Sequence, residues 1–207
     1  MPQLVFFTEL DAPRLEDLLA QPGVVETLRR HEYGLSMAIR DFSLSGAEAV
    51  RVLAAEGIGV TAWLLLPADA GYWFNVENYP QATAYYRAFS AWARSEQLRF
   101  NAVALGLEPS PQLRESLRYS FPLWLGRRLV AARTNSLFPA AQAAYRELTA
   151  EIRADGYPVH TYQYPFVVDD RRAGTTLVQR ALNIVDLPAD TEVLLCYSSR
   201  FPRLLFR

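Results

Sequence analysis

The chain contains no lysine, and this absence excludes several kinds of chemistry. All 21 of its basic residues are arginine, in a chain of 207 residues. Schiff-base aldolases, pyridoxal-phosphate enzymes and Walker-type phosphate loops each need a lysine amine. The formal net charge is −1, so there is no excess of positive charge to neutralise nucleic-acid phosphates. We therefore expect none of these enzyme classes and no nucleic-acid partner.

Cysteine and histidine are almost as scarce. The single Cys196 cannot form an internal disulfide or a cysteine metal cluster. Two histidines, His31 and His160, are too few for a histidine-rich zinc site. The motifs GxGxxG, GxSxG and HExxH do not occur. We expect no cofactor and no metal, and a chemistry carried by carboxylates, hydroxyls, aromatic rings and arginines.

Long hydrophobic runs are missing too. Val60–Pro67 is among the longest, far short of the roughly 20 residues that a membrane span needs. The first ten residues reach the acid Glu9 too soon for a secretory signal. We expect no membrane partner, and either a cytoplasmic protein or a mature domain whose signal is not present.

Six apolar segments of strand length alternate with helical patterns, which predicts a parallel sheet of βα units. The expected strands are Gln3–Thr8, Gly34–Arg40, Gly59–Leu66, Asn101–Leu107, Pro158–Tyr164 and Glu192–Ser198. Helix-start signals lie between them: Asp11 with Pro13, a capping box at Ser45–Glu48, and Asn78 before Pro80. No stretch has the composition of a flexible linker, so residues 1–199 are expected to form a single domain.

Two architectures fit this alternation, an open doubly wound sheet and a (β/α)₈ barrel. A barrel typically needs about 250 residues and eight units, whereas this chain supplies six. The tail 200–207 has neither helical nor strand periodicity. We expect an α/β fold with six βα units of an incomplete TIM barrel, shortened by a premature stop or a frameshift. Its first and sixth strands would be open edges, which favours self-association.

In either architecture the ligand binds beyond the carboxyl ends of the strands. Polar residues that follow the apolar runs are therefore the candidates for a site. They are Glu9, Arg40, Asp41, the loop 69–78, Glu108, Gln163, Tyr164, Asp169, Ser198 and Ser199.

Alternation along the fourth expected strand distinguishes Glu108 from the others. Val103, Leu105 and Leu107 share one face, whereas the small Ala104 and Gly106 share the other with Glu108. In a barrel the second face points to the axis, which places Glu108 in the mouth. Arg40 has the same parity on the second strand, so it would either converge with Glu108 on one pocket or neutralise it as a structural ion pair.

The loop Ala70–Asn78 alternates aromatic and polar residues. Tyr72 and Trp73 would cover the C–H face of a sugar, and Asn75 would bond its hydroxyls. The alternative is that these rings pack onto the following helix. With Arg40, Asp41, Tyr164 and Asp169 they are the expected substrate-binding residues.

Three segments carry a resemblance: Asn101–Leu107 followed by Glu108-Pro109, the run Trp63–Pro67, and the loop Gly71–Asn75. Together they resemble a bacterial glycoside-hydrolase-like TIM barrel, over residues 3–199. In that clan, and in its chitinase-like group, a glutamate at the end of the fourth strand is the general acid. The resemblance implies that role for Glu108.

The sequence also departs from that pattern. Chitinase-like proteins have aspartates two, four and six residues before the glutamate, where this chain has Gly106, Ala104 and Ala102. Leu107 stands where the larger clan usually has asparagine. Retaining enzymes of that clan carry their nucleophile at the end of a seventh strand, whereas only six strands are expected here. Asp41 and Asp169 are the candidates for a second carboxylate. The expected function is carbohydrate binding or cleavage; the alternatives are a non-catalytic carbohydrate-binding pseudoenzyme, an inactive fragment, and a metal-dependent sugar isomerase or epimerase.

Overall fold

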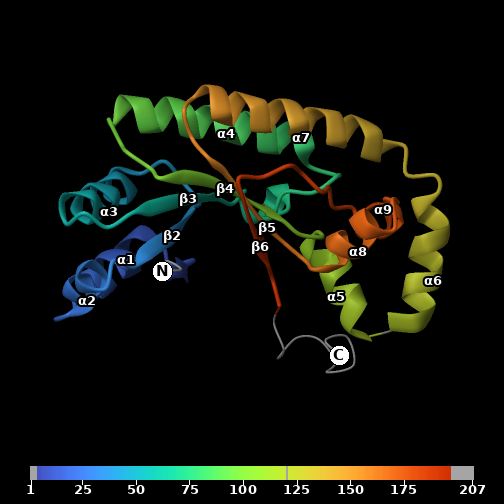
Figure 1. Cartoon of the computed structure of the whole chain (residues 1–207), viewed down its shortest axis with the longest axis horizontal. Coiled ribbons are helices and arrows are strands. Elements are labelled where there is room, and N and C mark those ends of the chain that lie inside the picture. The colour runs from blue at the N-terminus through green and yellow to red at the C-terminus, as the bar shows by residue number, and fades with distance from the viewer. Residues whose placement is uncertain (1–3, 120, 197–207) are drawn as a thin grey trace.

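Six parallel strands form one sheet in the order β1-β2-β3-β4-β5-β6. The structure is a computed structural model that describes residues 4–119 and 121–196. The sheet is curled through 218° as a half-barrel (Figure 1), so the predicted α/β fold and sequential strand order are confirmed. Its strands are β1 (Val5–Thr8), β2 (Gly34–Ile39), β3 (Val60–Leu64), β4 (Ala102–Leu107), β5 (Val159–Gln163) and β6 (Thr191–Leu194). Ser198 and the tail 200–207 lie outside the described residues.

Helices connect the strands, and α4 and α7 lie side by side across the convex face of the sheet (Figure 1). No helix in the described part of the chain is long and apolar enough to cross a membrane. The connections are α1 (Ala12–Leu19) and α2 (Val24–Arg30), α3 (Leu44–Ala55), η1 (Ala68–Ala70) and α4 (Tyr79–Ser95), α5 (Pro111–Tyr119), α6 (Phe121–Ala132) and α7 (Leu137–Ala154), and α8 (Phe166–Arg172) and α9 (Leu177–Leu182).

The outward face of the sheet packs against these helices. Leu105 and Leu107 of β4 are fully buried in one cluster with Phe89 of α4 and Leu148 of α7. Burial on this face explains the alternation in the sequence, since residues two apart on a strand point the same way. The inner face carries the small Ala104 and Gly106, as the sequence predicts.

The inner face carries three aromatic rings in contact, those of Tyr162, Phe7 and Trp63. The Tyr162 ring lies 4.9 Å from that of Phe7 on β1 and 5.6 Å from that of Trp63 on β3. Its hydroxyl shares a 2.7 Å hydrogen bond with Ser36 of β2. Tyr162 itself belongs to β5, so these contacts cross the hollow of the half-barrel and hold distant strands near one another.

Helix starts follow the sequence signals with one shift. Asp11 caps α1 as expected, accepting a hydrogen bond from the Arg14 N–H. The cap of α3 is Ser43, which accepts from the Gly46 N–H, so the predicted cap at Ser45 is wrong by two residues. Ser45 lies inside the first turn because the chain enters the helix earlier, at Leu44.

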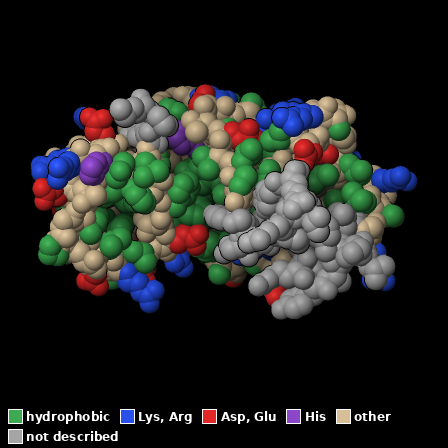
Figure 2. All heavy atoms as spheres, turned by 60° about the horizontal axis from the view of Figure 1, so that its bottom comes forward, with side chains coloured by type: hydrophobic (Ala, Val, Ile, Leu, Met, Phe, Trp, Pro, Cys, Tyr) green, Lys and Arg blue, Asp and Glu red, His purple; other side chains and the backbone are tan. Residues whose placement is uncertain are grey.

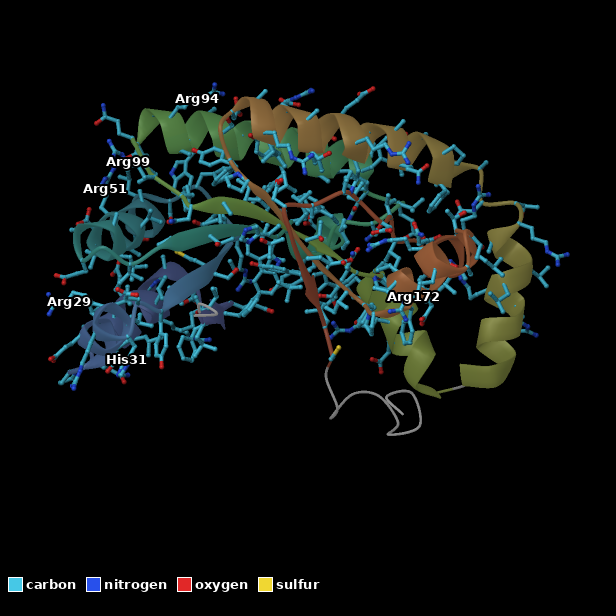
Figure 3. The ribbon with its side chains drawn as sticks, in the orientation of Figure 1. Arg29, His31, Arg51, Arg94, Arg99 and Arg172 are labelled. Carbon is cyan, nitrogen blue, oxygen red and sulfur yellow. The ribbon has the colours of Figure 1, made fainter. Side chains whose placement is uncertain are left out.

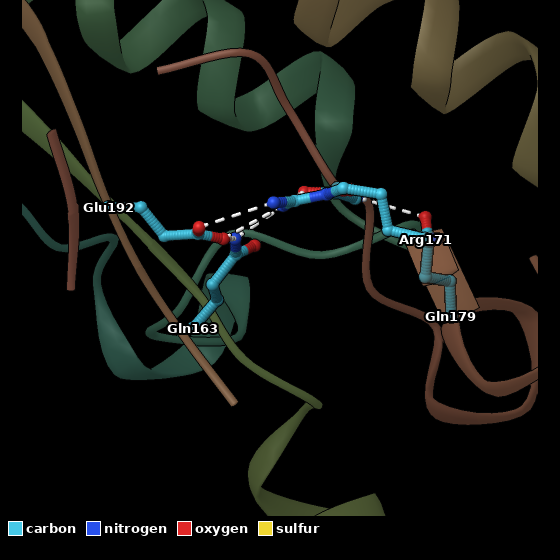
Figure 4. A network of polar contacts seen from close by, with 5 residues as sticks. Gln163, Arg171, Gln179 and Glu192 are labelled. Atoms are coloured by element: carbon cyan, nitrogen blue, oxygen red, sulfur yellow. Dashed lines mark hydrogen bonds and ion pairs between the residues drawn. The ribbon is translucent and has the colours of Figure 1, made fainter. Parts of the chain in front are cut away.

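A polar network fixes the outer side of β6 (Figure 4). Arg171 of α8 pairs with Asp186 at 2.7 Å and with Glu192 of β6 at 2.8 Å. The fully buried Gln163 of β5 also donates to Glu192. The hydrogen bond from Arg171 is the largest cause that lowers the pKa of Glu192. β6 is therefore held to α8 and β5 by charged and amide groups.

Within the described residues, β1 and β6 each pair with a strand on one side only. Leu4, Phe6 and Phe7 at the β1 edge are about half exposed, and Leu194 on β6 is 36% exposed. Figure 2 shows the face below the sheet of Figure 1, on which hydrophobic side chains gather. Cys196 is exposed just beyond β6, because it lies past the end of the sheet.

The first prediction concerns the inner layer. Tyr162→Phe keeps the ring but leaves the fully buried Ser36 hydroxyl without its partner, so we expect a loss of about 1–3 kcal/mol in the free energy of unfolding. Denaturant titration measures it. Ser36→Ala and the double variant complete the cycle, and the double should cost less than the two singles added together. Additive costs would show that the bond contributes no coupling.

The second prediction concerns the open edges. Because unpaired edge strands with apolar side chains tend to pair with another chain, we expect concentration-dependent association in sedimentation velocity. Phe6→Glu on β1 should weaken it. Val130→Glu, on the 69% exposed Val130 of α6, is the matched control and should not. A wild-type monomer at all concentrations would contradict this expectation.

Candidate functional site

Glu108 lies at the carboxyl end of β4 and is only 5% exposed. Gly106 and Ala104 precede it on the inner face, so β4 itself places no bulky side chain below it. Its Oε2 atom accepts a hydrogen bond from the Tyr164 hydroxyl at 3.1 Å and one from Arg114 Nη1 at 3.3 Å. Both bonds end on Oε2, so neither of them occupies Oε1.

The pKa of Glu108 is raised above its ordinary value of 4.5. Burial is the largest cause, because it disfavours the charged form. Arg114 and the Tyr164 hydroxyl lower the pKa, and the negative charge of Glu9 raises it further. Burial exceeds the effect of the ion pair, so Glu108 retains its proton to higher pH than an exposed glutamate.

Glu108 opens into a cavity of about 260 Å³ on the inner side of the half-barrel. Two carboxylates stand in its wall, Glu108 after β4 and Glu9 after β1. The curl of the sheet brings them to one cavity although their strands are three apart. The cavity is lined by Phe7, Glu9, Trp63, Tyr72, Trp73, Glu108, Arg114, Tyr162 and Leu195.

Glu9 is oriented by Tyr72. The Tyr72 hydroxyl donates to Glu9 Oε2 at 2.9 Å, and burial together with this bond raises the pKa of Tyr72 to about 12. Tyr72 has a φ of 61° and follows Gly71 at 100°. The left-handed region is costly for an aromatic residue, so the surrounding loop must hold it there.

Asn75 and Asn78 supply that restraint. Asn78 Nδ2 donates to the carbonyls of Ala70 and Trp73, and its Oδ1 accepts from the Asn75 N–H. Asn78 occupies the cap position of α4 as predicted, but its side chain bonds no helical N–H. The Asn75 side chain bonds Trp73 and Glu77 and is 1% exposed. Asn75 therefore shapes the loop and lines neither cavity described here.

Trp73 is packed against the acid's ion-pair partner. The Arg114 guanidinium lies 4.3 Å from the Trp73 ring centre, a cation–π arrangement. Trp73 also lies close to Gly106 of β4: a Cβ on Gly106 would stand 2.9 Å from Trp63 Nε1 and 3.4 Å from Trp73. Glycine at position 106 thus gives the two indole rings room beneath Glu108.

Arg40 does not neutralise Glu108; the partner is Arg114. Arg40 lies outside the cavity of Glu108, donates to the Glu9 carbonyl at 3.5 Å and lies 5.9 Å from the Tyr72 ring centre. Arg114 follows Glu108 by six residues, in the first turns of α5, which places its guanidinium over the strand end. With Asp41, Arg40 lines a second cavity of about 230 Å³.

The two other expected substrate-binding residues, Tyr164 and Asp169, line neither cavity. Tyr164 is 5% exposed, and its hydroxyl donates a hydrogen bond to Glu108. Asp169 is exposed on α8 and lines neither cavity. The structure thus brings Glu108, Tyr72 and Trp73 to one cavity, Arg40 and Asp41 to the other, and leaves Asp169 apart.

The sequence places Glu9 among the candidates for a site without giving it a role, and it gives no indication of the cavity residues Phe7, Trp63, Arg114 and Tyr162. Glu9 had a usable signal, because it is the first acid after β1. The sequence signal for Arg114 was weaker: this residue lies six positions after Glu108, near the start of α5. Arg29, Arg51, Arg94 and Arg99, labelled in Figure 3, lie at the outer edge of the molecule, so the abundance of arginine alone does not indicate Arg114.

Residues 4–119 and 121–196 contain no candidate metal site. No group of three His, Cys, Asp or Glu side chains there is placed to hold a metal ion. Burial lowers the pKa of His160, which lies within β5. The described residues therefore offer no ligand set for the metal-dependent isomerase alternative.

Comparison with known proteins identifies no family. No protein-family model matches the chain, and a search of curated protein sequences finds no match. The site must therefore be interpreted from its own chemistry.

A third prediction follows from the raised pKa of Glu108. Stability contributed by its protonated form is present below the unfolded value, near 4.5, and is lost as pH rises through the folded pKa. Glu108→Gln cannot lose a proton, so its free energy of unfolding should fall less than the wild type's as pH rises above 4.5. Urea titrations of both proteins at several pH values measure this, and parallel curves would contradict it.

Proposed function

We propose that the cavity of Glu108 binds a sugar unit and that the protein is a glycoside-hydrolase-like enzyme with Glu108 as general acid. The observation that carries this proposal is a buried carboxyl group with a raised pKa in the wall of an aromatic cavity. A carboxylic acid in such surroundings keeps the proton that a leaving-group oxygen needs.

The reaction would begin with proton transfer from Glu108 Oε1 to the glycosidic oxygen as the bond from that oxygen to the anomeric carbon breaks. The second carboxylate would be Glu9, rather than Asp41 or Asp169. It would attack the anomeric carbon directly at a carboxyl separation of about 5 Å, or activate a water at about 6.5–9.5 Å. With direct attack, a covalent glycosyl–enzyme intermediate forms and water later hydrolyses it. With an activated water, the water attacks the anomeric carbon as the glycosidic bond breaks.

Aromatic rings in the cavity suit a sugar. Trp73, Tyr72 and Trp63 offer flat apolar surfaces to pyranose C–H groups, and Glu9 and Arg114 offer an acceptor and a donor for hydroxyls. Tyr164 would act through Glu108, since it bonds Oε2 from outside the cavity. The partner of this protein is then a carbohydrate.

The Arg114–Glu108 ion pair favours a second candidate, a carbohydrate-binding protein without catalysis. A guanidinium 3.3 Å from the carboxyl group stabilises its charged form, and a carboxylate that stays charged cannot donate a proton. The same cavity would then bind sugars without cleaving them.

A fourth prediction separates these candidates. In a panel of aryl glycosides, Glu108→Gln should reduce turnover by about 10²–10⁴-fold, because the amide has no transferable proton. Sugar binding, followed by isothermal titration calorimetry, should survive in this variant. Trp73→Ala should do the reverse and weaken binding through loss of the ring.

One control variant completes that experiment. Glu16→Gln changes an exposed glutamate of α1 and should leave turnover and melting temperature unchanged. An unchanged rate in Glu108→Gln would end the catalytic assignment. Sugar binding by the wild type with no turnover would favour the binding protein, and a fall in melting temperature alone would make Glu108 a partner of Arg114 only.

A further inference from the structure

We propose that the second cavity is a subsite for a neighbouring sugar unit, and that the ligand is a chain of at least two units lying across Tyr72. This inference rests on the proposed function, since it concerns what the Glu108 site accepts. It assigns Arg40 and Asp41 to recognition of the second unit, away from the reacting bond.

The two cavities share one wall. Tyr72 lines both the cavity of Glu108 and the second cavity, and their volumes are similar, about 260 and 230 Å³. Each is below the range of about 300–1,000 Å³ typical of pockets for drug-sized ligands, which suits a single ring. The two together reach that range, so a ligand of two rings could use both.

The shared wall is held in place by three polar and ring contacts. Tyr72 donates to the Glu9 side chain at 2.9 Å, and Arg40 donates to the Glu9 carbonyl at 3.5 Å. Arg40 also lies over the Tyr72 ring. The backbone of Tyr72 is in the left-handed region, which is unfavourable for an aromatic residue. Its place between the cavities therefore depends on these contacts and on the loop hydrogen bonds of Asn78.

The chemistry of the second cavity matches a neutral polyhydroxyl ring. Its lining includes the apolar Met37, Ile39 and Trp92 and the charged Asp11, Arg40 and Asp41. The apolar side chains can pack against C–H groups, while the arginine donates to hydroxyl oxygens and the carboxylates accept from hydroxyl hydrogens. Glu108 does not line this cavity, so the unit bound here would be held without reacting.

The test is chain-length dependence of binding. Calorimetry on the full chain would use cello-, manno-, xylo- and chito-oligosaccharides of one to four units. For the series that binds, the two-unit sugar should bind at least about tenfold more tightly than the single unit, about 1.4 kcal/mol. Asp41→Asn, which changes a residue that lines the second cavity alone, should remove most of that gain and leave single-unit affinity unchanged. Arg172→Gln, at an exposed position of α8 (Figure 3), is the control.

The outcomes are distinct. Equal affinity for one-unit and two-unit sugars, or equal losses for both in the Asp41 variant, would overturn the second subsite and leave the proposed function standing. No binding of any sugar to the wild type would overturn the proposed function, and the subsite with it. Circular dichroism melting curves confirm that each variant is folded, so a loss of affinity is a loss of contacts.

Discussion

The packing around Tyr162 is the constraint on which the site depends. A ring on β5 contacts a ring on β1 and another on β3, and its hydroxyl bonds β2. Contacts of this kind are available only in a curled sheet, since in a flat one three strands would separate β1 from β5. The curl turns the carboxyl ends of the strands toward a common centre, and Glu9 and Glu108 come to line one cavity.

The electrostatics of that cavity depend on the balance between burial and ion pairing. Arg114 and Tyr164 both stabilise the charged form of Glu108, and burial opposes them. Burial is the larger effect, so the carboxyl group is biased toward its protonated form. Arg114 has a second contact, the face of Trp73, and so links the acid to the aromatic loop. A change in this arginine would therefore alter both the acid and the ring that would pack against a sugar.

Much of the fold could be predicted from the sequence, because burial imposes alternation on each strand. The faces of β4 and the position of Glu108 follow directly from that period. Partners of side chains were harder to predict. Arg40 has the right parity to reach Glu108, yet Arg114 on α5 is the residue in contact, since a helix turn after the strand end brings it closer. Asn75 has the polarity of a ligand contact but supports the strained loop, a role that only its hydrogen-bond partners reveal.

The titration of the Glu108 carboxyl group can be observed directly. Carbon-13 NMR of protein labelled at glutamate carboxyl carbons, with the Glu108 resonance assigned from Glu108→Gln, would follow its titration. The expected result is a pKa above 4.5 for Glu108 that falls when Glu9 is changed to glutamine, because one negative neighbour is removed. A Glu108 carboxyl that titrates at or below 4.5 would contradict its role as the proton donor.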